Sequence, residues 1–207
     1  MHSPLPRSFF NRNTITVARA LLGQKLIRLD PKTNTLVGGL IIEVEAYLGP
    51  HDKAAHTYNH HRTPRVETMW GPPGHAYVYF TYGMHHCMNV TTRPADTPQA
   101  VLIRALAPTD NLSLMYTRRK KAKRDRDLCS GPAKLTQALG IDLTHGNTDL
   151  TTPPTPYSPL CILQIRKRAY PSSHIVATPR IGVAYAEEWA PKPLRFYLRH
   201  SQHLTTP

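Results

Sequence analysis

Cysteines are few in this sequence, and long apolar segments are missing. The three cysteines, Cys87, Cys129 and Cys161, are widely spaced and form no CxxC pair. An odd number of scattered cysteines argues against a disulfide framework and is typical of a reducing compartment. No apolar run approaches the ~18 residues that can cross a bilayer, and residues 1–6 lack the apolar stretch of a secretory signal. We therefore expect a cytoplasmic protein with no membrane partner.

Negative charge is also scarce. The chain has 13 Asp and Glu against 26 Lys and Arg, which gives a net charge of +13. A folded domain this basic attracts a polyanion, and nucleic acid is the most common one. An anionic membrane surface is the alternative, but the sequence contains no long amphipathic helix with a basic face to lie on it. The charge therefore favours a nucleic-acid partner.

Histidine, by contrast, is abundant. Seven of the 12 histidines fall in one third of the chain, among them His51, His56, His60, His61, His85 and His86. A tetrahedral zinc site needs ligands at defined spacings, usually including thiolates. These histidines show no such spacing, so we expect neither a metal nor another cofactor.

The hydrophobic pattern predicts more strands than helices. No repeat or change of composition divides the chain, and we expect one domain over residues 1–207. Helices are predicted at 14–22, closed by Gly23, and from 131 or 132 to 139, capped by Ser130 and ended by Gly140. Strands are predicted at 25–30, 36–47, 76–92 with a turn at its centre, 99–106, 159–166, 179–185 and 193–199. Residues 50–75 are expected to be loop. Because the strands do not alternate with helices, an α+β domain is favoured over a doubly wound one.

Residues 41–47 alternate between apolar and polar side chains. The period of two in a strand places Glu43, Glu45 and Tyr47 on one face. The simpler interpretation is a half-buried strand with a solvated acidic face. The alternative is catalytic, because acids are scarce here and a hydrolase can use a carboxylate beside an aromatic ring to activate water.

Tyrosines are concentrated in the next segment. Tyr77, Tyr79 and Tyr82 lie within six positions, and two β-rich runs flank Tyr82-Gly83-Met84, which suggests a hairpin. Tyrosines on strands are ordinarily core or interface residues. Tyr82 differs because it stands at the turn, where its own fold offers little to pack against. It could instead wedge between base pairs.

A basic run at 118–126 follows further along the chain. Most such runs are solvated loops, but this one could hold a phosphate backbone by counterion release. Residues 130–135 come next and combine the start of a predicted helix with Lys134. Together they are a candidate anion site.

Taken together, these segments resemble the alkyladenine (3-methyladenine) DNA glycosylase family of the mammalian type. The similarity begins with Glu45-Ala46-Tyr47-Leu48-Gly49-Pro50, Asp52 and Ala54-Ala55-His56. It continues in the same order through Tyr77-Val78-Tyr79, Tyr82-Gly83-Met84, Cys87-Met88-Asn89, Leu102-Ile103-Arg104-Ala105-Leu106, Ser130-Gly131-Pro132 and Pro193-Leu194-Arg195-Phe196-Tyr197. It extends from about Phe10 to Arg199.

The resemblance implies a fold and an activity. The fold would be a single mixed α/β domain on a curved antiparallel sheet, with a protruding β-hairpin that inserts into DNA. The activity would be that of a monofunctional glycosylase, which flips out alkylated purines and hydrolyses their bond to deoxyribose. We expect 3-methyladenine and 7-methylguanine as substrates and extend the range to hypoxanthine and ethenoadenine. The partner would be double-stranded DNA in a bacterial nucleoid, and the protein a compact monomer.

The resemblance also assigns roles to residues. Glu45 matches the general base, and Arg104 matches the residue that helps position the catalytic water. The residues matching the base pocket are the walls Tyr47, His56 and Tyr79, the purine-edge reader Ala54, and Asn89, which screens purines by clashing with a 2-amino group.

Another set of residues is expected to contact DNA outside the pocket. Tyr82 matches the residue that fills the gap left by the flipped nucleotide. The further DNA contacts that we predict come from Met84, Thr63, Arg65 and Lys134.

Two other functions are compatible with parts of the sequence. A non-catalytic DNA-binding protein on the same scaffold would bind lesions and release no base, but it would have no use for the carboxylate of Glu45. An acyl- or formyl-transferase-like domain is the other alternative, and the tyrosine hairpin and the positive charge argue against it. Apart from Lys53, no lysine accompanies the pocket motifs as a Schiff-base nucleophile, so a hydrolase is expected rather than a lyase.

Overall fold

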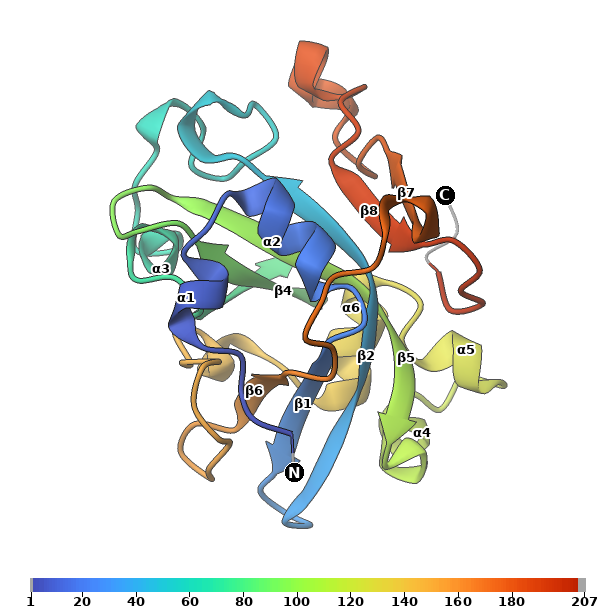
Figure 1. The fold of residues 1–207 in the computed structure, drawn as a ribbon. Coiled ribbons are helices and arrows are strands. Elements are labelled where there is room, and N and C mark those ends of the chain that lie inside the picture. Colours follow the sequence, from blue (N-terminus) through green and yellow to red (C-terminus); the bar gives the residue numbers. More distant parts are fainter. Residues whose placement is uncertain (1, 205–207) are drawn as a thin grey trace.

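The computed structural model describes residues 2–204 and confirms the α+β class. Its eight described strands form one sheet in which every pairing is antiparallel, in the order β3-β4-β5-β2-β1-β6, with β8 beside β2 and β7 beside β8 (Figure 1). The strands are β1 (Lys25–Asp30), β2 (Thr35–Tyr47), β3 (Ala76–Thr81), β4 (His85–Thr92), β5 (Gln99–Asp110), β6 (Leu160–Leu163), β7 (Ile175–Thr178) and β8 (Arg195–Leu198).

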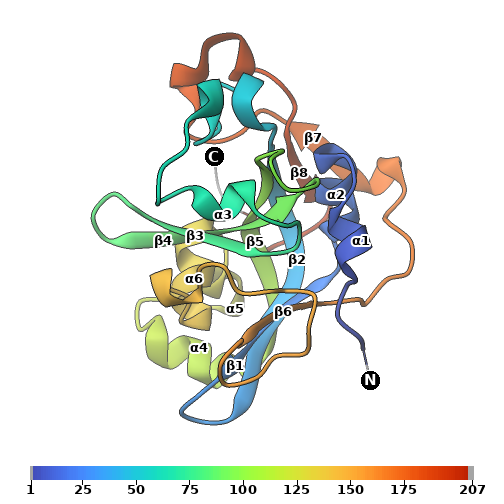
Figure 2. The ribbon, with the colours of Figure 1, turned by 90° about the vertical axis from the view of Figure 1, so that its left-hand side faces the viewer.

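The helices are short and cover both faces of the sheet. They are α1 (Arg7–Phe10), α2 (Thr14–Leu21), α3 (Glu67–Trp70), α4 (Leu112–Arg118), α5 (Asp125–Leu128) and α6 (Pro132–Leu139), with 3-10 turns at Gly49–His51, Tyr58–His60, Leu143–His145, Ser172–His174 and Ala184–Trp189. Helix α2 packs on β2 and β5 from one side, and α6 packs on β4 and β5 from the other (Figures 1 and 2). No helix among the described residues is long and apolar enough to cross a membrane.

Helix α2 illustrates how the sequence sets the boundaries of an element. The Asn13 side chain accepts hydrogen bonds from the amides of Ile15 and Thr16, which satisfies two of the free donors at the start of the helix. Val17 and Leu21 are fully buried against the sheet. The chain then leaves the helix through Gly23 at φ +80°, a backbone conformation that favours glycine.

Strand β2 is the centre of the sheet and is covered on both faces. It pairs with β5 along nearly its whole length and shifts register around Glu43, a β-bulge type of irregularity that bends a strand. Glu43 and Glu45 are both fully buried, at 0% exposure. The interpretation of this strand face as solvated and acidic is therefore wrong. Arg104 from β5 and Arg195 from β8 supply the charge that allows these carboxylates to be buried.

Strands β3 and β4 form an antiparallel pair joined by residues 82–84. At this turn Tyr82 is 84% exposed and Met84 is 70% exposed. Tyr82 has a φ of +52° and Gly83 a φ of +65°, so the chain reverses through two residues in the left-handed region. The tyrosine at the tip therefore faces solvent with little of its own fold against it.

Three local predictions are wrong. Residues 179–185 are not a strand, because Pro179 lacks an amide donor and Gly182 has a φ of +77°, and β7 ends before them at Thr178. Ser130 does not cap α6. Gly131 occupies the cap position at φ +148° without a side-chain hydrogen bond, and the Ser130 hydroxyl accepts one from Lys134 instead. The region 50–75 is not entirely loop, since it contains α3.

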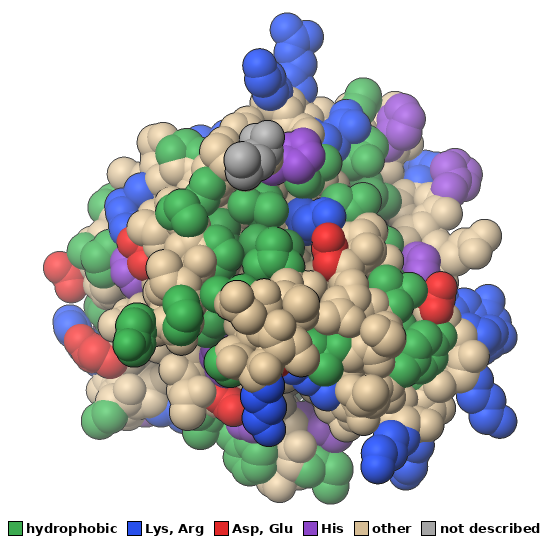
Figure 3. Space-filling view, turned by 90° about the horizontal axis from the view of Figure 1, so that it is seen from below, with side chains coloured by type: hydrophobic (Ala, Val, Ile, Leu, Met, Phe, Trp, Pro, Cys, Tyr) green, Lys and Arg blue, Asp and Glu red, His purple; other side chains and the backbone are tan. Residues whose placement is uncertain are grey.

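The basic run at 118–126 divides into a structural part and an exposed part. Arg118 pairs with Asp30 and donates to the carbonyls of α6, so it is not a solvated residue. Lys120, Lys121 and Lys123 are exposed. Lys and Arg side chains gather on the right of Figure 3, the side on which α4 and α5 lie in Figure 1.

Candidate active site

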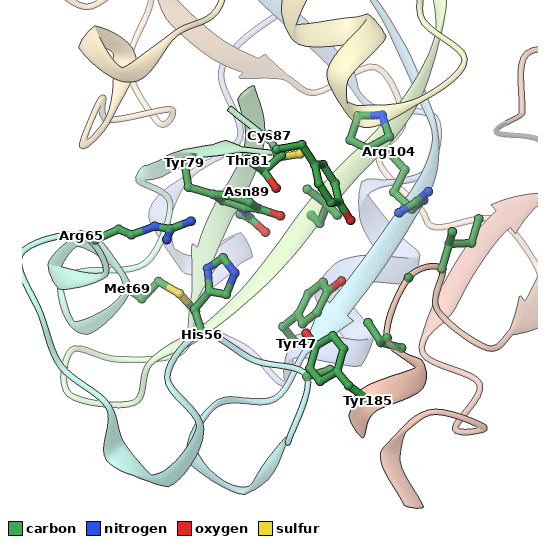
Figure 4. Close-up of a pocket in the computed structure, with 17 residues that line it drawn as sticks. Tyr47, His56, Arg65, Met69, Tyr79, Thr81, Cys87, Asn89, Arg104 and Tyr185 are labelled. Atoms are coloured by element: carbon green, nitrogen blue, oxygen red, sulfur yellow. The ribbon is translucent and has the colours of Figure 1, made fainter. Parts of the chain in front are cut away.

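A cavity of about 330 Å³ opens on the face of the sheet that carries α6. Ligand pockets begin at about 300 Å³, so this one suits a single small ring system. Its lining comes from β2, β3, β4 and β5, from α3 and the start of α6, and from the segments between elements, namely Tyr47, Ala54, His56, Arg65, Met69, Tyr79, Thr81, Tyr82, Cys87, Asn89, Leu102, Arg104, Pro132, Ile181, Gly182, Val183 and Tyr185. Figure 4 shows Tyr47 and Tyr185 on one side and His56, Tyr79 and Asn89 on the other.

The Glu45 carboxylate lies behind Tyr47 and Arg104 in the cavity wall. Its Oε2 atom accepts a hydrogen bond from the Tyr47 hydroxyl at 2.9 Å and pairs with Arg104 Nη1 at 3.1 Å. Its Oε1 atom accepts from the amide of Ile181 at 2.8 Å. Three donors from three different segments therefore orient one fully buried carboxylate and stabilise its charge.

Arg104 joins the two carboxylates of β2. Its Nε donates to Glu43 Oε1 at 3.1 Å, while its Nη1 faces Glu45. The Arg195 guanidinium approaches the same Glu43 oxygen at 3.1 Å. Burial opposes the charge of Arg104, but Glu45 and Glu43 outweigh burial and raise its pKa. The arginine is thus a fixed cation between the cavity and the interior.

Aromatic rings form the opposite wall. The His56 ring meets the Tyr79 ring edge to face, with centroids 4.6 Å apart, and Tyr77 stacks on Tyr79 at 5.6 Å. The Tyr77 hydroxyl lies 2.7 Å from His56 Nδ1 and fixes the orientation of the imidazole. Burial raises the pKa of Tyr77 to about 12 and raises those of Tyr47 and Tyr79 further, so these phenols are neutral at pH 7.

His56 is uncharged at neutral pH. Its ring is exposed on the cavity side, yet partial removal from water, together with the nearby charges of Arg65 and His61, lowers its pKa to about 4. The aromatic side chains of the cavity are thus neutral, and the positive charges in its lining come from Arg65 and Arg104. No group of three or more His, Cys, Asp or Glu within residues 2–204 is arranged to hold a metal ion.

The chain is similar to known proteins along most of its length. The family model described as methylpurine-DNA glycosylase matches residues 8–202. Proteins named "Putative 3-methyladenine DNA glycosylase" from two strains of Bacillus cereus are each 46% identical, over 93% and 94% of this chain and 94% and 95% of their own. One from Bacillus mycoides is 45% identical over 93% of this chain and 94% of its own.

The chain belongs to the methylpurine-DNA glycosylase family. It is therefore a DNA glycosylase, an enzyme of base excision repair that hydrolyses N-glycosidic bonds. The relatives named above are bacterial, so they do not support the narrower resemblance to the mammalian type.

The glycosylase structure brings most of the predicted site residues together. All the predicted pocket residues line the cavity, as do Arg104, Tyr82 and Arg65, and Glu45 lies directly behind the wall. Thr63, Met84 and Lys134 do not line it. Thr63 is half-buried and the other two are exposed, so a role for them would lie outside the cavity.

Asn89 is held firmly at the cavity wall. It is 4% exposed, and its Nδ2 donates to the carbonyl of Tyr77 at 3.1 Å across the β3–β4 pair. The donor end of the amide therefore faces the strand, and this bond opposes rotation of the side chain away from the cavity. The same bond is also the structural role that a strand asparagine can have without any part in recognition.

Several residues of this glycosylase site are not evident from the sequence. Tyr185 lines the cavity at 67% exposure, on the 3-10 segment after Gly182. Arg180 is buried behind Tyr47. With 26 basic residues in the chain, no sequence signal marks Arg180 as buried. Pro179 and Gly182, which flank Arg180 and Ile181, are the sequence signal that residues 179–185 do not form a strand.

Proposed function

We propose that this glycosylase is a monofunctional hydrolase that excises alkylated purines, chiefly 3-methyladenine and 7-methylguanine, from double-stranded DNA. One observation carries the proposal. The Glu45 carboxylate is fully buried and oriented by three donors in the wall of a cavity large enough for a base. A buried carboxylate held by specific donors beside a cavity is the arrangement that a catalytic general base requires.

The substrate must leave the duplex to reach this cavity. A stacked base cannot present its glycosidic bond, so the nucleotide is flipped out at a cost of a few kcal/mol. Tyr82, exposed at the tip of the β3–β4 pair and also at the cavity rim, is placed to occupy the gap in the stack.

The cavity walls favour a positively charged base. Purines alkylated at N3 or N7 are cationic as nucleosides, and Tyr47 and Tyr79 offer electron-rich faces worth roughly 0.5–2 kcal/mol to a cation. His56 adds no opposing charge at neutral pH because its pKa is about 4. We extend the substrate range to hypoxanthine and ethenoadenine, which are neutral and would depend more on shape.

The chemistry then needs little more than an activated water. A cationic purine is already a good leaving group, so Glu45 deprotonates a water that attacks C1′ of the flipped nucleotide. Such general-base assistance contributes about 10²–10⁴-fold to a rate. Arg104, in contact with the carboxylate at 3.1 Å, helps to place that water. The proposal includes a single domain over residues 1–207, working as a monomer on nucleoid DNA in the bacterial cytoplasm.

Strand integrity tests the hydrolytic mechanism. A duplex with one 7-methylguanine is incubated with the protein and divided into samples with and without alkali. A monofunctional enzyme leaves the strand whole until alkali cleaves the abasic site. Strand cleavage without alkali, or a covalent complex trapped by borohydride, would identify a lyase instead.

A pH titration tests the role given to His56. Because the pKa of His56 is about 4 in the folded protein, we expect affinity for a 7-methylguanine duplex to stay constant from pH 8 to 6. It should fall as His56 gains a proton below about pH 5, since the imidazolium then adds to the positive charges of Arg65 and Arg104 in the cavity lining. His56→Gln should remove the fall. A decline centred near pH 6.5 in the wild type would mean that His56 titrates normally.

The same pKa affects folding. The unfolded chain binds a proton at His56 with a pKa of about 6.5, above the folded value of about 4. Lowering the pH from about 6.5 to 4 therefore favours the unfolded state through this residue, and His56→Gln should be less sensitive over that window. The midpoint of urea unfolding, followed across these pH values, measures the difference.

Replacing Tyr82 tests duplex insertion. Tyr82→Ala should lower single-turnover excision from a duplex about tenfold, because the flipped state loses the ring that fills the stack. Excision from the same lesion in a single strand, where no gap forms, should change by less than about twofold. Tyr157→Ala is the matched control, since Tyr157 is 99% exposed and does not line the cavity. Equal losses on both substrates would assign Tyr82 to the pocket rather than to insertion.

A further inference from the structure

A buried ion pair lies directly behind the Tyr47 wall of the cavity. Arg180 and Asp52 are 128 residues apart in the chain, and both side chains are 0% exposed. Arg180 donates two parallel hydrogen bonds to the carboxylate, from Nη1 to Oδ2 at 2.6 Å and from Nη2 to Oδ1 at 2.8 Å. This bidentate geometry is a strong form of charge-assisted hydrogen bonding.

The pair connects three segments that line the cavity. Asp52 accepts hydrogen bonds from the amides of Leu48 at 2.9 Å and Ala54 at 3.0 Å. Arg180 Nη1 also donates to the carbonyl of Ala46 at 3.0 Å. The end of β2, the loop of Ala54 and the segment after Arg180 are therefore held together at one point.

Arg180 also contacts the ring of Tyr47. Its guanidinium carbon lies 4.7 Å from the ring centroid. Tyr47 lines the cavity and the buried Arg180 does not, so the guanidinium lies on the ring face turned away from the cavity. Burial opposes its charge, but the hydrogen bonds and charge of Asp52 outweigh burial and raise the pKa of Arg180. A permanent cation therefore stands behind the ring.

This placement matters for a cationic ligand. A positively charged base stacked on the cavity face of Tyr47 would have a second cation on the other face of the same ring. Two like charges at this separation repel, and buried groups are screened much less than exposed ones. The carboxylate of Asp52 is close enough to cancel the field of Arg180. Arg180 can therefore hold the Tyr47 ring in place, while Asp52 removes the repulsion that its charge would exert on a cationic base.

We propose that the Asp52–Arg180 pair sets the preference of the cavity for cationic over neutral purines. Arg180 is a positioning residue that supports the Tyr47 ring, and Asp52 neutralises the charge behind that ring. The inference rests on the proposed function, because it takes the cavity to be the pocket of a flipped purine.

Single substitutions at the two positions have opposite expected effects. Asp52→Asn leaves Arg180 charged and unpaired, which should lower the preference for a cationic base by about tenfold. Arg180→Gln leaves the Asp52 carboxylate behind Tyr47 without its cation, with the amides of Leu48 and Ala54 as its remaining donors, and should raise the preference. A purely structural role would weaken the binding of cationic and neutral bases alike in both variants.

Two isosteric bases isolate the charge. One duplex carries 7-methylguanine on a 2′-fluorinated sugar, where the electron-withdrawing fluorine slows loss of the base. The other carries 7-methyl-7-deazaguanine, which has the same shape without the positive charge. Dissociation constants for both duplexes, measured by fluorescence anisotropy, give one ratio for each protein. We expect that ratio to move in opposite directions from the wild-type value in Asp52→Asn and Arg180→Gln.

Asp30→Asn is the matched control. Asp30 forms a buried pair with Arg28 at 3.0 Å, with side-chain exposures of 4% and 9%, and neither residue lines the cavity. Its loss should lower thermal stability as the loss of Asp52 does, but leave the binding ratio unchanged. The melting temperature of each variant shows which proteins are folded.

The outcomes separate the two proposals. An unchanged ratio in the folded variants, or a shift in the same direction in both, overturns the inference. If one variant does not fold, the direction of the shift in the other decides. If the wild type binds neither isostere better than an undamaged duplex, the proposed function itself is wrong.

Discussion

Replacing Glu45 with glutamine is expected to lower the single-turnover rate of base excision by at least about a hundredfold. Glutamine keeps the size of the side chain but cannot take a proton from water. Lesion binding should fall far less than the rate, because the aromatic walls of the cavity remain and Glu45 is not among its lining residues. Rates with enzyme in excess, together with dissociation constants for an uncleavable lesion analogue, measure the two effects separately.

Glu43→Gln is the control for this result, and it tests the effect of removing a neighbouring buried carboxylate that does not act on water. Glu43 is as buried as Glu45 and shares Arg104 with it, so its loss should lower the free energy of unfolding. It faces Arg195 rather than the cavity, and the excision rate should fall less than about tenfold. Undiminished excision in Glu45→Gln would remove Glu45 from the mechanism. Equal losses in both variants would assign the effect to the charge network as a whole.

Shortening Asn89 to alanine is expected to relax the rejection of guanine. Guanine carries a 2-amino group that hypoxanthine lacks, and crowding it or leaving it without a hydrogen-bond partner costs roughly 1–3 kcal/mol. In 7-methylguanine, which has the same group, the attraction of its positive charge to the aromatic walls offsets this cost. The bond of Asn89 to the Tyr77 carbonyl at 3.1 Å opposes its turning aside to admit the 2-amino group. Guanine excision should therefore rise about tenfold relative to excision of 3-methyladenine. The measurement is a ratio of single-turnover rates on two duplexes that differ in the target base.

The hydrogen bond of Asn89 to the backbone requires a matched control. Thr57→Ala removes a similar bond, from a fully buried hydroxyl to the Pro98 carbonyl at 3.0 Å, and Thr57 does not line the cavity. Both variants should lose stability, but the ratio should move in Asn89→Ala alone. If the ratio stays at its wild-type value there, Asn89 has the structural role and not the screening one.

The sequence predicts most of the sheet because its signals there are local. The helix at 14–22 and the strands at 25–30 and 36–47 depend on periodicity and on turn residues such as Gly23, and the structure places these elements within a residue or so. Residues 179–185 fail because alternating apolar residues imitate a strand. Instead of pairing with a strand, this segment donates a hydrogen bond from the amide of Ile181 to Glu45, which lies 136 residues away in the chain.

The sequence predicts those residues of the candidate site that lie in segments resembling family motifs. The segments around Glu45, His56, Tyr79 and Asn89 resemble family motifs, and the structure gathers them around one cavity. Burial is what the sequence does not reveal. An alternating strand fits a solvated acidic face as well as a buried one, and the two arginines that decide between them come from other strands. The Asp52–Arg180 pair cannot be predicted from the sequence either, because its two residues are 128 positions apart in the chain.

Free base released from methylated duplex DNA is the most direct test of the account. DNA treated with a radiolabelled methylating agent is incubated with the wild-type protein, and the soluble products are separated by chromatography. We expect labelled 3-methyladenine and 7-methylguanine as free bases, in amounts that depend on the enzyme. Binding of the methylated DNA without release of either base would contradict the account and leave a non-catalytic lesion-binding protein in its place.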